Sequence, residues 1–426
     1  MWNEGLRQVD KSQTLLLNEQ SRAREREGRE VFKFGFGQSP FPPIEAAREA
    51  LRAHAGAKDY TAVQGLPELR ERVAAFHAAV DGIDVDADRV LVGPGSKALL
   101  YTVMRAYERA DVLVPVPAWV SYRPQALLAG HACLPVETSF EQAWRVTPEA
   151  LESAVRAKAD PDTPSLLILN HPGNPDGLGY GDEALKALAR TCRKHRILVL
   201  SDEIYGLLDH AGAHVSMARH YPEGTIVTGG LSKWCGAGGW RLGVAMLPST
   251  LSPAFLDTLL GIASETYSCA SLPVQHAACA AYEWNPATRD YLAHQRRLLA
   301  ALGQRVQRRL EAAGVRVHAP TGGFYLLPDF TPHADALRRR GIESSQSLCL
   351  GLAADTGVTL LPGDAFGLPP ARPCARLAYV DFDGVAALQA SREIGLDRAL
   401  DDATLRLVFG KTLGGVDRIA QWLAAL

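Results

Sequence analysis

The chain has 426 residues, enough for two or three domains of ordinary size or for one large catalytic unit with a smaller one attached. Its 45 basic and 47 acidic residues nearly cancel to a formal net charge of −2, which excludes the strongly basic surface of a protein that binds nucleic acid or an anionic membrane. The basic residues divide into only nine lysines against 36 arginines, so chemistry that needs a lysine has few candidates.

The seven cysteines are scattered and none lies in a Cys-x-x-Cys arrangement, which argues against a disulfide framework or a structural zinc site. The first residues carry early charge and no apolar segment, so we expect no secretory signal. The longest stretch without charged residues, 266–282, contains proline, glutamine and histidine and falls short of a membrane-spanning helix. We therefore expect a cytoplasmic enzyme that acts on small molecules, without a metal, nucleic acid or membrane partner.

A run of alternating charges at residues 21–30 is expected to form a solvated helix. Short apolar strands then alternate with alanine-rich helical stretches up to about residue 250. The expected strands are residues 89–93, 111–116, 165–170, 197–202, 225–229 and 242–246. This alternation predicts an α/β fold in which helices cover both faces of a largely parallel sheet. Ligands bind such sheets at the carboxyl ends of the strands, so functional residues should follow strands directly.

A long helical pattern from about residue 285 ends at Gly314, a typical glycine C-cap, and is expected to lead into a second unit. That unit is expected to contain strands at 315–318, 323–327, 358–361 and 376–379 and a final helix up to residue 426. The strand-like segment 31–36 is expected to pack with it. We therefore predict an N-terminal arm over residues 1–45, a large domain over 46–290 and a small C-terminal domain over 291–426.

Two loops after predicted strands carry polar residues. Gly95, Ser96 and Lys97 begin a helix, where backbone N–H groups and a hydroxyl form a cradle for an anion, although an ordinary capped helix is as compatible with this pattern. Residues 170–177 (Asn-His-Pro-Gly-Asn-Pro-Asp-Gly) form a turn fixed by prolines and glycines, and a plain turn explains them equally well.

Two further strand ends hold ionisable residues. Asp202 and Tyr205 follow the fourth strand, where an aspartate is often only a helix N-cap, but two such groups at this edge favour a functional role. Lys233 follows the fifth strand between glycines and tryptophans, eight residues before Arg241. Such a lysine is expected to be desolvated, which suits an amine that forms a Schiff base, whereas most lysines are solvated surface residues. The other eight lysines lie in less suitable contexts, so Lys233 stands apart.

These motifs, in this order and at this spacing, resemble the fold-type I pyridoxal-phosphate enzymes and specifically the class I and II aminotransferases. The resemblance extends over nearly the whole chain, from residues 37–42 to Arg376. It implies a large domain with a mostly parallel sheet and helices on both faces, and a smaller α+β domain formed by the N- and C-terminal segments. It also implies pyridoxal 5′-phosphate as cofactor and an amino acid and a 2-keto acid as substrates.

The resemblance assigns roles around the cofactor ring. Lys233 would form the Schiff base with the aldehyde, and Asp202 would pair with the pyridine nitrogen so that the ring acts as an electron sink. Tyr205 and Asn174 resemble the pair that hydrogen-bonds the phenolic oxygen. Trp119 resembles the aromatic residue that stacks on the ring, although a tryptophan in a structural core would look the same in the sequence.

It also assigns the contacts to phosphate and substrate. The residues that resemble the phosphate cup are Gly95, Ser96, the Lys97 amide and Arg241. Arg376 resembles the arginine that binds the substrate α-carboxylate, for which a planar guanidinium is suited, and Gly37 resembles the glycine beside it. Tyr60 resembles the tyrosine that reaches the cofactor phosphate from the neighbouring subunit, which implies a homodimer. Ser271 is expected to add a phosphate or interface contact.

Some positions depart from the family pattern, although none removes a catalytic group. Asp176 stands where threonine is usual, Gly230 where some relatives have serine, and Gln38-Ser39 where Glu-Pro is more frequent. These departures leave open whether the phosphate contacts and the substrate pocket are typical.

The implied reaction is a ping-pong transamination in which the freed Lys233 amine moves a proton from the substrate α-carbon. The same lysine, electron sink and carboxylate clamp also serve β- or γ-elimination, substitution or oxidation of an amino acid, so these reactions stay open.

A non-catalytic regulator would need a DNA-binding domain, for which the N-terminal segment is too short. A nicotinamide-binding enzyme would need a Gly-x-Gly-x-x-Gly motif after the first strand, which the sequence lacks. Phe36, Tyr122 and Phe324 are expected near the entrance and suit aromatic or aliphatic substrates equally.

Overall fold

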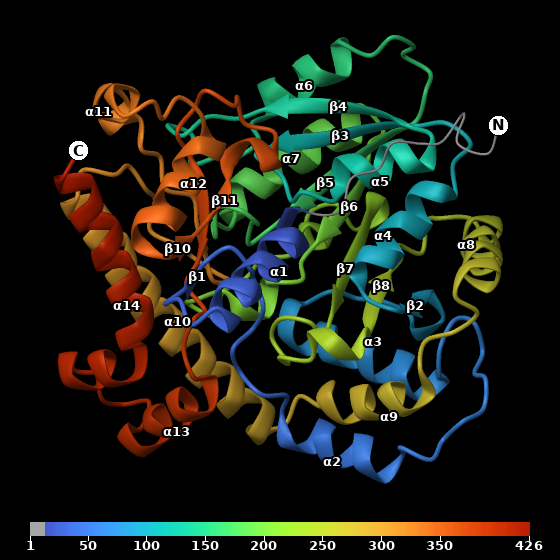
Figure 1. The fold of residues 1–426 in the computed structure, drawn as a ribbon. Helices are drawn as coiled ribbons and strands as arrows, with labels where there is room; N and C mark the ends of the chain where they lie inside the picture. The colour runs from blue at the N-terminus through green and yellow to red at the C-terminus, as the bar shows by residue number, and fades with distance from the viewer. Residues whose placement is uncertain (1–12) are drawn as a thin grey trace, which may run out of the picture.

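A computed structural model describes residues 13–426. Lys11 and the segment on which the expectation of no secretory signal rests lie outside the described residues. The fold is built around a seven-stranded sheet with the strand order β2-β8-β7-β6-β5-β3-β4 (Figure 1). The strands are β2 (Val90–Gly93), β3 (Asp111–Val116), β4 (Ala132–Glu137), β5 (Ser165–Asn170), β6 (Leu198–Asp202), β7 (Thr225–Gly230) and β8 (Gly243–Met246). All neighbouring pairs are parallel except those made by β8, which runs antiparallel to both β2 and β7.

The six strands expected in this region are confirmed, and the sequence did not indicate β4. That strand lies at an edge of the sheet and pairs only with β3. Its side chains are largely exposed or half-buried, and it contains Pro135 and Glu137. A strand of this kind needs no continuous apolar run, so it leaves little signal in the sequence.

Helices cover both faces of the sheet, as the apolar strands require. Val112 and Val114 of β3 pack in a cluster with α4 and α5, whereas Leu113 between them packs in another cluster with α6 and α7. This division follows from the alternation of side chains along a strand. The helices from the N-terminus through this region are α1 (Gln13–Arg26), α2 (Glu45–Ala53), α3 (Pro67–Asp81), α4 (Ser96–Arg105), α5 (Tyr122–Ala129), α6 (Pro148–Arg156), α7 (Asp182–Lys194), α8 (Pro253–Thr266) and α9 (Leu272–Ala281).

The N-terminal segment and the last third of the chain pack together, as expected. β1 (Phe32–Lys33) pairs in parallel with β10 (Val358–Thr359), and a second small sheet has the order β11-β12-β9. Its strands are β9 (Tyr325–Leu326), β11 (Leu361–Pro362) and β12 (Ala375–Ala378). The helices of this region are α10 (Pro286–Ala312), α11 (Ala334–Arg339), α12 (Ser345–Thr356), α13 (Gly384–Ile394) and α14 (Asp402–Ala424), several of which lie together at one side of the molecule (Figure 1).

Three expectations for this region need correction. Residues 315–318 form no strand, since only Arg316 makes an isolated bridge, to Asp329. The strand expected at 358–361 is divided between β10 and β11, which belong to different sheets. In the charged run, the helix ends at Arg26, before the run does. Among residues 13–426, no helix has both the length and the hydrophobicity needed to cross a membrane.

Candidate active site

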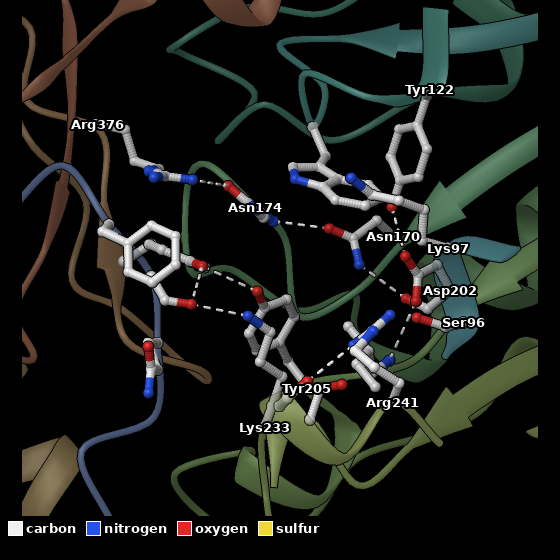
Figure 2. A pocket seen from close by; sticks show the side chains of 18 of the residues that line it. Ser96, Lys97, Tyr122, Asn170, Asn174, Asp202, Tyr205, Lys233, Arg241 and Arg376 are labelled. Carbon is white, nitrogen blue, oxygen red and sulfur yellow. Dashed lines mark hydrogen bonds between the residues drawn. The ribbon is translucent and has the colours of Figure 1, made fainter. Parts of the chain in front are cut away.

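A cavity of about 530 Å³ lies at the carboxyl ends of the parallel strands and is bounded on its other side by the N-terminal segment, β9 and β12 (Figure 2). This is the position expected for a ligand in an open α/β sheet. Its lining residues are Phe36, Gly37, Gln38, Ser96, Lys97, Trp119, Tyr122, Asn170, Asn174, Asp202, Ile204, Tyr205, Ser232, Lys233, Gly238, Gly239, Arg241, Tyr325 and Arg376. Of these residues, four are cationic and only Asp202 is acidic.

Asp202 is the last residue of β6 and is buried, with 3% of its surface exposed. The Tyr122 hydroxyl donates a hydrogen bond of 2.6 Å to Asp202 Oδ2, and the Ile204 amide lies 3.4 Å from Oδ1. Burial raises the pKa of Asp202 to about 6, although the bonds from Tyr122 and Ile204 and the charge of Lys233 act in the opposite direction. A binding partner with positive charge would therefore gain from this carboxylate and stabilise its ionised form.

Lys233 lies in the turn after β7 and reaches across the cavity to the N-terminal segment. Its Nζ donates a hydrogen bond of 2.8 Å to the Gly37 carbonyl and lies 5.4 Å from the centre of the Tyr205 ring. The turn requires Gly230, whose φ is +151° and where a β-carbon would lie 2.6 Å from the Leu242 carbonyl oxygen. Gly230 is thus explained by the close approach of β7 to the start of β8.

The cavity has a cationic end formed by the N-terminus of α4 and by Arg241. Gly95 has a φ of +100°, and a β-carbon there would overlap the Arg241 guanidinium, so the cradle depends on glycine. Arg241 has a φ of +57°, a backbone conformation that is unfavourable for a residue with a side chain, and donates to the carbonyls of Gly238 (2.9 Å) and Pro94 (3.0 Å). The free amides of a helix start and a guanidinium together suit a phosphate group.

Lys97 adds a further cation to the cavity. Its Nζ lies 4.9 Å from the centre of the Trp119 ring. Burial lowers the pKa of Lys97, and the nearby charges of Arg241 and Lys233 lower it further. A negatively charged ligand group would relieve this repulsion.

Arg376 in β12 is the largest fully buried side chain of the described residues. Its Nη1 donates to Asn174 Oδ1 (2.9 Å) and its Nη2 to the Gly35 carbonyl (2.6 Å), while Nε has no partner. Within residues 13–426 it forms no ion pair with a carboxylate, and burial lowers its pKa. A buried guanidinium without a counterion is costly, so the arrangement suits a carboxylate brought by a ligand.

The residues that the sequence predicted for contacts to cofactor and substrate line this cavity, except Gly95, Tyr60 and Ser271. Gly95 lies against the Arg241 guanidinium, since a β-carbon at Gly95 would overlap Arg241 Nη2. Tyr60 lies in the loop between α2 and α3 and is 89% exposed, outside the cavity of its own chain. Ser271 is the N-cap residue of α9 and does not line the cavity either.

Two of the three aromatic residues expected near the entrance lie elsewhere. Tyr122 lies at the base of the cavity beside Asp202, because α5 directs its hydroxyl toward the end of β6. Phe324 is fully buried and packs against Tyr205, with 5.6 Å between ring centres. Phe36 lines the cavity as expected.

The sequence predicted no individual role for two polar residues of the lining, Asn170 and Tyr325. Asn170 donates to the Asp202 carbonyl (2.8 Å) and accepts from the Asn174 amide (2.7 Å). It pairs with Asp202 across β5 and β6, so the rule that functional residues follow strands could have identified it. The Tyr325 hydroxyl lies 2.9 Å from that of Tyr205, and no sequence motif marks it.

The sequence and the fold are similar to those of known proteins. The family model described as aminotransferase class I and II matches residues 29–385. The aspartate aminotransferase of Geobacillus stearothermophilus is 34% identical over 84% of this chain and 90% of its own, and the asparagine–oxo-acid transaminase of Streptococcus mutans is 30% identical over 85% and 91%. The solved structure of the aspartate aminotransferase from Thermus thermophilus with maleate matches with a TM-score of 0.81 and 27% identity over 98% of this chain and 100% of that one.

Proposed function

The chain belongs to the class I and II aminotransferases, and from this premise we propose how its residues share the work of a pyridoxal-phosphate-dependent transaminase. Its similarity to named transaminases does not favour the alternative of elimination, substitution or oxidation at the amino acid. The observation that supports our assignment best is that Lys233, Asp202 and Arg376, from three distant segments, line one cavity.

The cavity fits the cofactor in its donor groups. Gly95, the start of α4 and Arg241 form a cradle for the phosphate, and the buried Asp202 provides the only carboxylate of the lining. When bound, the cofactor ring withdraws electrons from the α-carbon of the amino acid attached to it. Asp202 would hold a proton at the ring nitrogen, and Trp119 would lie against the ring face. Asn174 Oδ1 accepts a hydrogen bond from Arg376. The Nδ2 group of Asn174 is therefore left to donate to the phenolic oxygen, together with the Tyr205 hydroxyl.

Lys233 would have two tasks. It would bind the aldehyde of the cofactor through Nζ, and after exchange for the substrate amine its free Nζ would take the proton from the α-carbon. Both tasks require Nζ to leave the Gly37 carbonyl, its present acceptor. The rings of Tyr205 and Phe324 lie 5.4 and 5.6 Å from Nζ, and the lysine itself is half-buried.

Arg376 would bind the α-carboxylate of the substrate. The partnerless Nε and the absence of an acidic neighbour among the described residues leave it in need of an anion. Held between Asn174 and the Gly35 carbonyl, the guanidinium would fix the carboxylate, and with it the direction of the α-carbon to hydrogen bond. Gly37 would lie beside this carboxylate, where a β-carbon would overlap Tyr325.

The charges of the cavity support a dicarboxylic amino acid, such as aspartate, as amino donor. Of the four cationic residues of the lining, Arg241 would bind the phosphate, Arg376 the α-carboxylate and Lys233 the aldehyde. The fourth, Lys97, is then available to pair with a second carboxylate of the substrate. The name of the relative from Geobacillus stearothermophilus agrees with a donor of this type, whereas the relative from Streptococcus mutans is named for asparagine, whose side chain is a neutral amide. Exchange of amino groups should be measured with ¹⁵N-labelled aspartate, asparagine, leucine and phenylalanine against excess 2-oxoglutarate. Stoichiometric transfer of label, fastest from aspartate, would support both proposals, and release of free ammonia would contradict transamination.

We also propose a homodimer in which Tyr60 of one subunit reaches the phosphate site of the other, because Tyr60 is exposed in its own chain. Inactive Tyr60→Ala and Lys233→Ala variants, mixed so that subunits exchange, should regain activity, since one site of each mixed dimer would be intact. A monomer in sedimentation, or no recovery on mixing, would contradict this arrangement.

The domain division and the compartment also stay proposals. The three segments 1–45, 46–290 and 291–426 are supported by the separate sheets, although the second boundary falls inside α10. A cytoplasmic location is supported by the seven cysteines, all of which are free thiols.

A further inference from the structure

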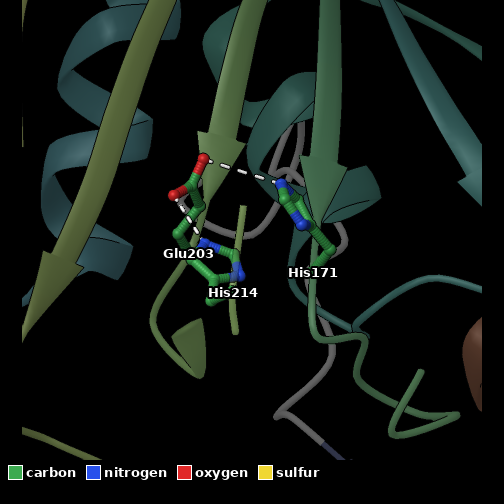
Figure 3. A group of neighbouring side chains, drawn as sticks. All are labelled: His171, Glu203 and His214. Atoms are coloured by element: carbon green, nitrogen blue, oxygen red, sulfur yellow. Dashed lines mark hydrogen bonds and ion pairs between the residues drawn. The ribbon is translucent and has the colours of Figure 1, made fainter. Parts of the chain in front are cut away.

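A second buried charge cluster lies directly behind Asp202 and has no part in the chemistry described above. Glu203, His171 and His214 form it, and Figure 3 shows the contacts from the carboxylate to each of the two imidazoles. Glu203 Oε2 lies 2.9 Å from His214 Nε2, and Oε1 lies 3.6 Å from His171 Nε2. Because side chains alternate along a strand, Glu203 leaves the end of β6 on the face opposite to Asp202.

The surroundings of Glu203 favour an ion pair over a metal site. Its Oε1 already accepts hydrogen bonds from Ser201 Oγ (2.6 Å), Ser216 Oγ (2.8 Å) and the Met217 amide (3.2 Å). Three donors occupy this oxygen, so only Oε2 is left, and His214 lies against it. The three side chains have the spacing of metal ligands, but the carboxylate is already satisfied by protein donors.

The position of Glu203 creates an electrostatic problem for Asp202. Two consecutive carboxylates are buried together, and the charge of Glu203 contributes to the raised pKa of Asp202. Only the ionised form of Asp202 can hold a proton on a ring nitrogen by an ion pair. Glu203 must therefore be compensated if Asp202 is to stay ionised near neutral pH.

His214 is placed to provide this compensation. Although burial opposes its charged form, the hydrogen bond and the charge of Glu203 raise the pKa of His214. Burial likewise opposes the charged form of Glu203, but the two histidines hold the pKa of Glu203 well below its usual range. Burial lowers the pKa of His171, so His171 acts as a neutral partner.

Other charged groups face the cluster from neighbouring elements. They are Asp202 on β6, Asp81 on α3, Asp209 in the loop after β6, and Arg145 in the loop before α6. Asp81 and Asp209 both favour the charged form of His214, whereas Arg145 acts on His171. These charges therefore favour a protonated His214 and a neutral His171.

We propose that His214 carries a proton that neutralises Glu203 and so keeps Asp202 ionised for the cofactor ring. His214 and Glu203 are positioning residues, since neither lines the cavity. This inference rests on the proposed role of Asp202, and it makes a prediction that a merely structural histidine would not: removing Glu203 should repair the loss of His214.

The test compares His214→Gln, Glu203→Gln and the double variant, with His220→Gln as matched control because His220 pairs with Asp182 at 2.8 Å far from the cavity. The dissociation constant of pyridoxal phosphate from each apoenzyme is measured by quenching of tryptophan fluorescence between pH 5 and 9. In His214→Gln the pH below which affinity falls should rise by about one unit, which weakens binding about tenfold on the acid side. Glu203→Gln and the double variant should stay within about threefold of the wild type.

The second readout is the ¹⁵N spectrum of the histidine-labelled apoenzyme, which needs no cofactor. His214 should show the imidazolium signature at pH 7.5 in the wild type and lose it in Glu203→Gln, which also tests the proposal if His214→Gln does not fold. A neutral His214 in the wild type, no rescue in the double variant, or a stoichiometric metal bound by the cluster would overturn the inference. If Asp202→Asn binds the cofactor as well as the wild type, the proposed role of Asp202 fails instead, whatever the state of His214.

Discussion

The two sides of the cavity are built in different ways. One side, here called the cofactor wall, consists of residues that follow or precede strands of the same sheet, namely Ser96, Asn174, Asp202, Tyr205, Lys233 and Arg241. The other side, the substrate wall, consists of Gly37, Tyr325 and Arg376, which come from segments nearly 340 residues apart at the extremes. The cofactor wall is positioned by one continuous sheet, whereas the substrate wall depends on the docking of separate segments.

Few bonds join the two walls. Lys233 bonds the Gly37 carbonyl, Asn174 bonds Arg376, and Tyr205 bonds Tyr325. The first of these must break for catalysis, so only the other two of these bonds can persist through the reaction. We expect changes in the cofactor wall to abolish chemistry, and changes in the substrate wall to weaken substrate binding while cofactor binding is kept.

The largest effect is expected for Lys233→Ala. Loss of the amine that binds the aldehyde and moves the proton should reduce turnover about 10³-fold or more and remove the visible absorption of lysine-bound cofactor. Steady-state kinetics and the absorption spectrum measure both. Lys186→Ala is the control, because Lys186 forms salt bridges only on the surface of α7. An unchanged spectrum in Lys233→Ala would exclude it as the binding residue.

Arg376→Lys comes second and tests the substrate wall. The charge is kept but the forked geometry is lost, which should cost about 2 kcal/mol and lower kcat/KM roughly 30-fold, chiefly through KM. The affinity for the cofactor, measured by fluorescence, should not change. The exposed Arg338→Lys serves as control. A loss confined to cofactor binding would contradict our assignment of substrate binding, and not cofactor binding, to the substrate wall.

The pH dependence of cofactor binding is third. Burial raises the pKa of Asp202 to about 6, and only its ionised form pairs with a protonated ring nitrogen. Affinity should therefore be constant well above pH 6 and fall about tenfold between pH 7 and pH 5, as the carboxylate gains a proton. Titrations of the apoenzyme measure this fall. Asp202→Asn should be weaker throughout and lack this step, and a wild type without an acid limb would refute the assignment.

The smallest effect is expected for Tyr325→Phe. The change removes the hydroxyl that lies 2.9 Å from Tyr205 and 3.4 Å from the Gly37 carbonyl, but keeps the ring against Arg376. We expect a cost of about 1 kcal/mol, or roughly fivefold in kcat/KM. Kinetics with the buried Tyr379→Phe as comparison would measure it, and a loss as large as that of Lys233→Ala would mean that Tyr325 takes part in the chemistry.

The same contrast explains what the sequence predicted. Apart from Arg241, which precedes β8, residues of the cofactor wall follow apolar strands that are visible in the sequence, so their positions could be expected from parallel-sheet geometry. Arg376 and Gly37 were named only through the family resemblance. Tyr325 was missed because nothing local marks it, since its place depends on the pairing of β9 with β12. The Glu203–His214 pair was missed for the same reason, because it is made by residues that meet only after the loop behind β6 has folded back.

The most direct measurement is to trap the bond between protein and cofactor. The purified enzyme is loaded with pyridoxal phosphate and reduced with borohydride, which converts the carbon–nitrogen double bond into a stable amine, and the labelled peptide is identified by mass spectrometry. With nine lysines in the chain, the account predicts one label per subunit, on Lys233. A label on another lysine, such as Lys97 in the same cavity, or no label on a fully loaded enzyme, would contradict it.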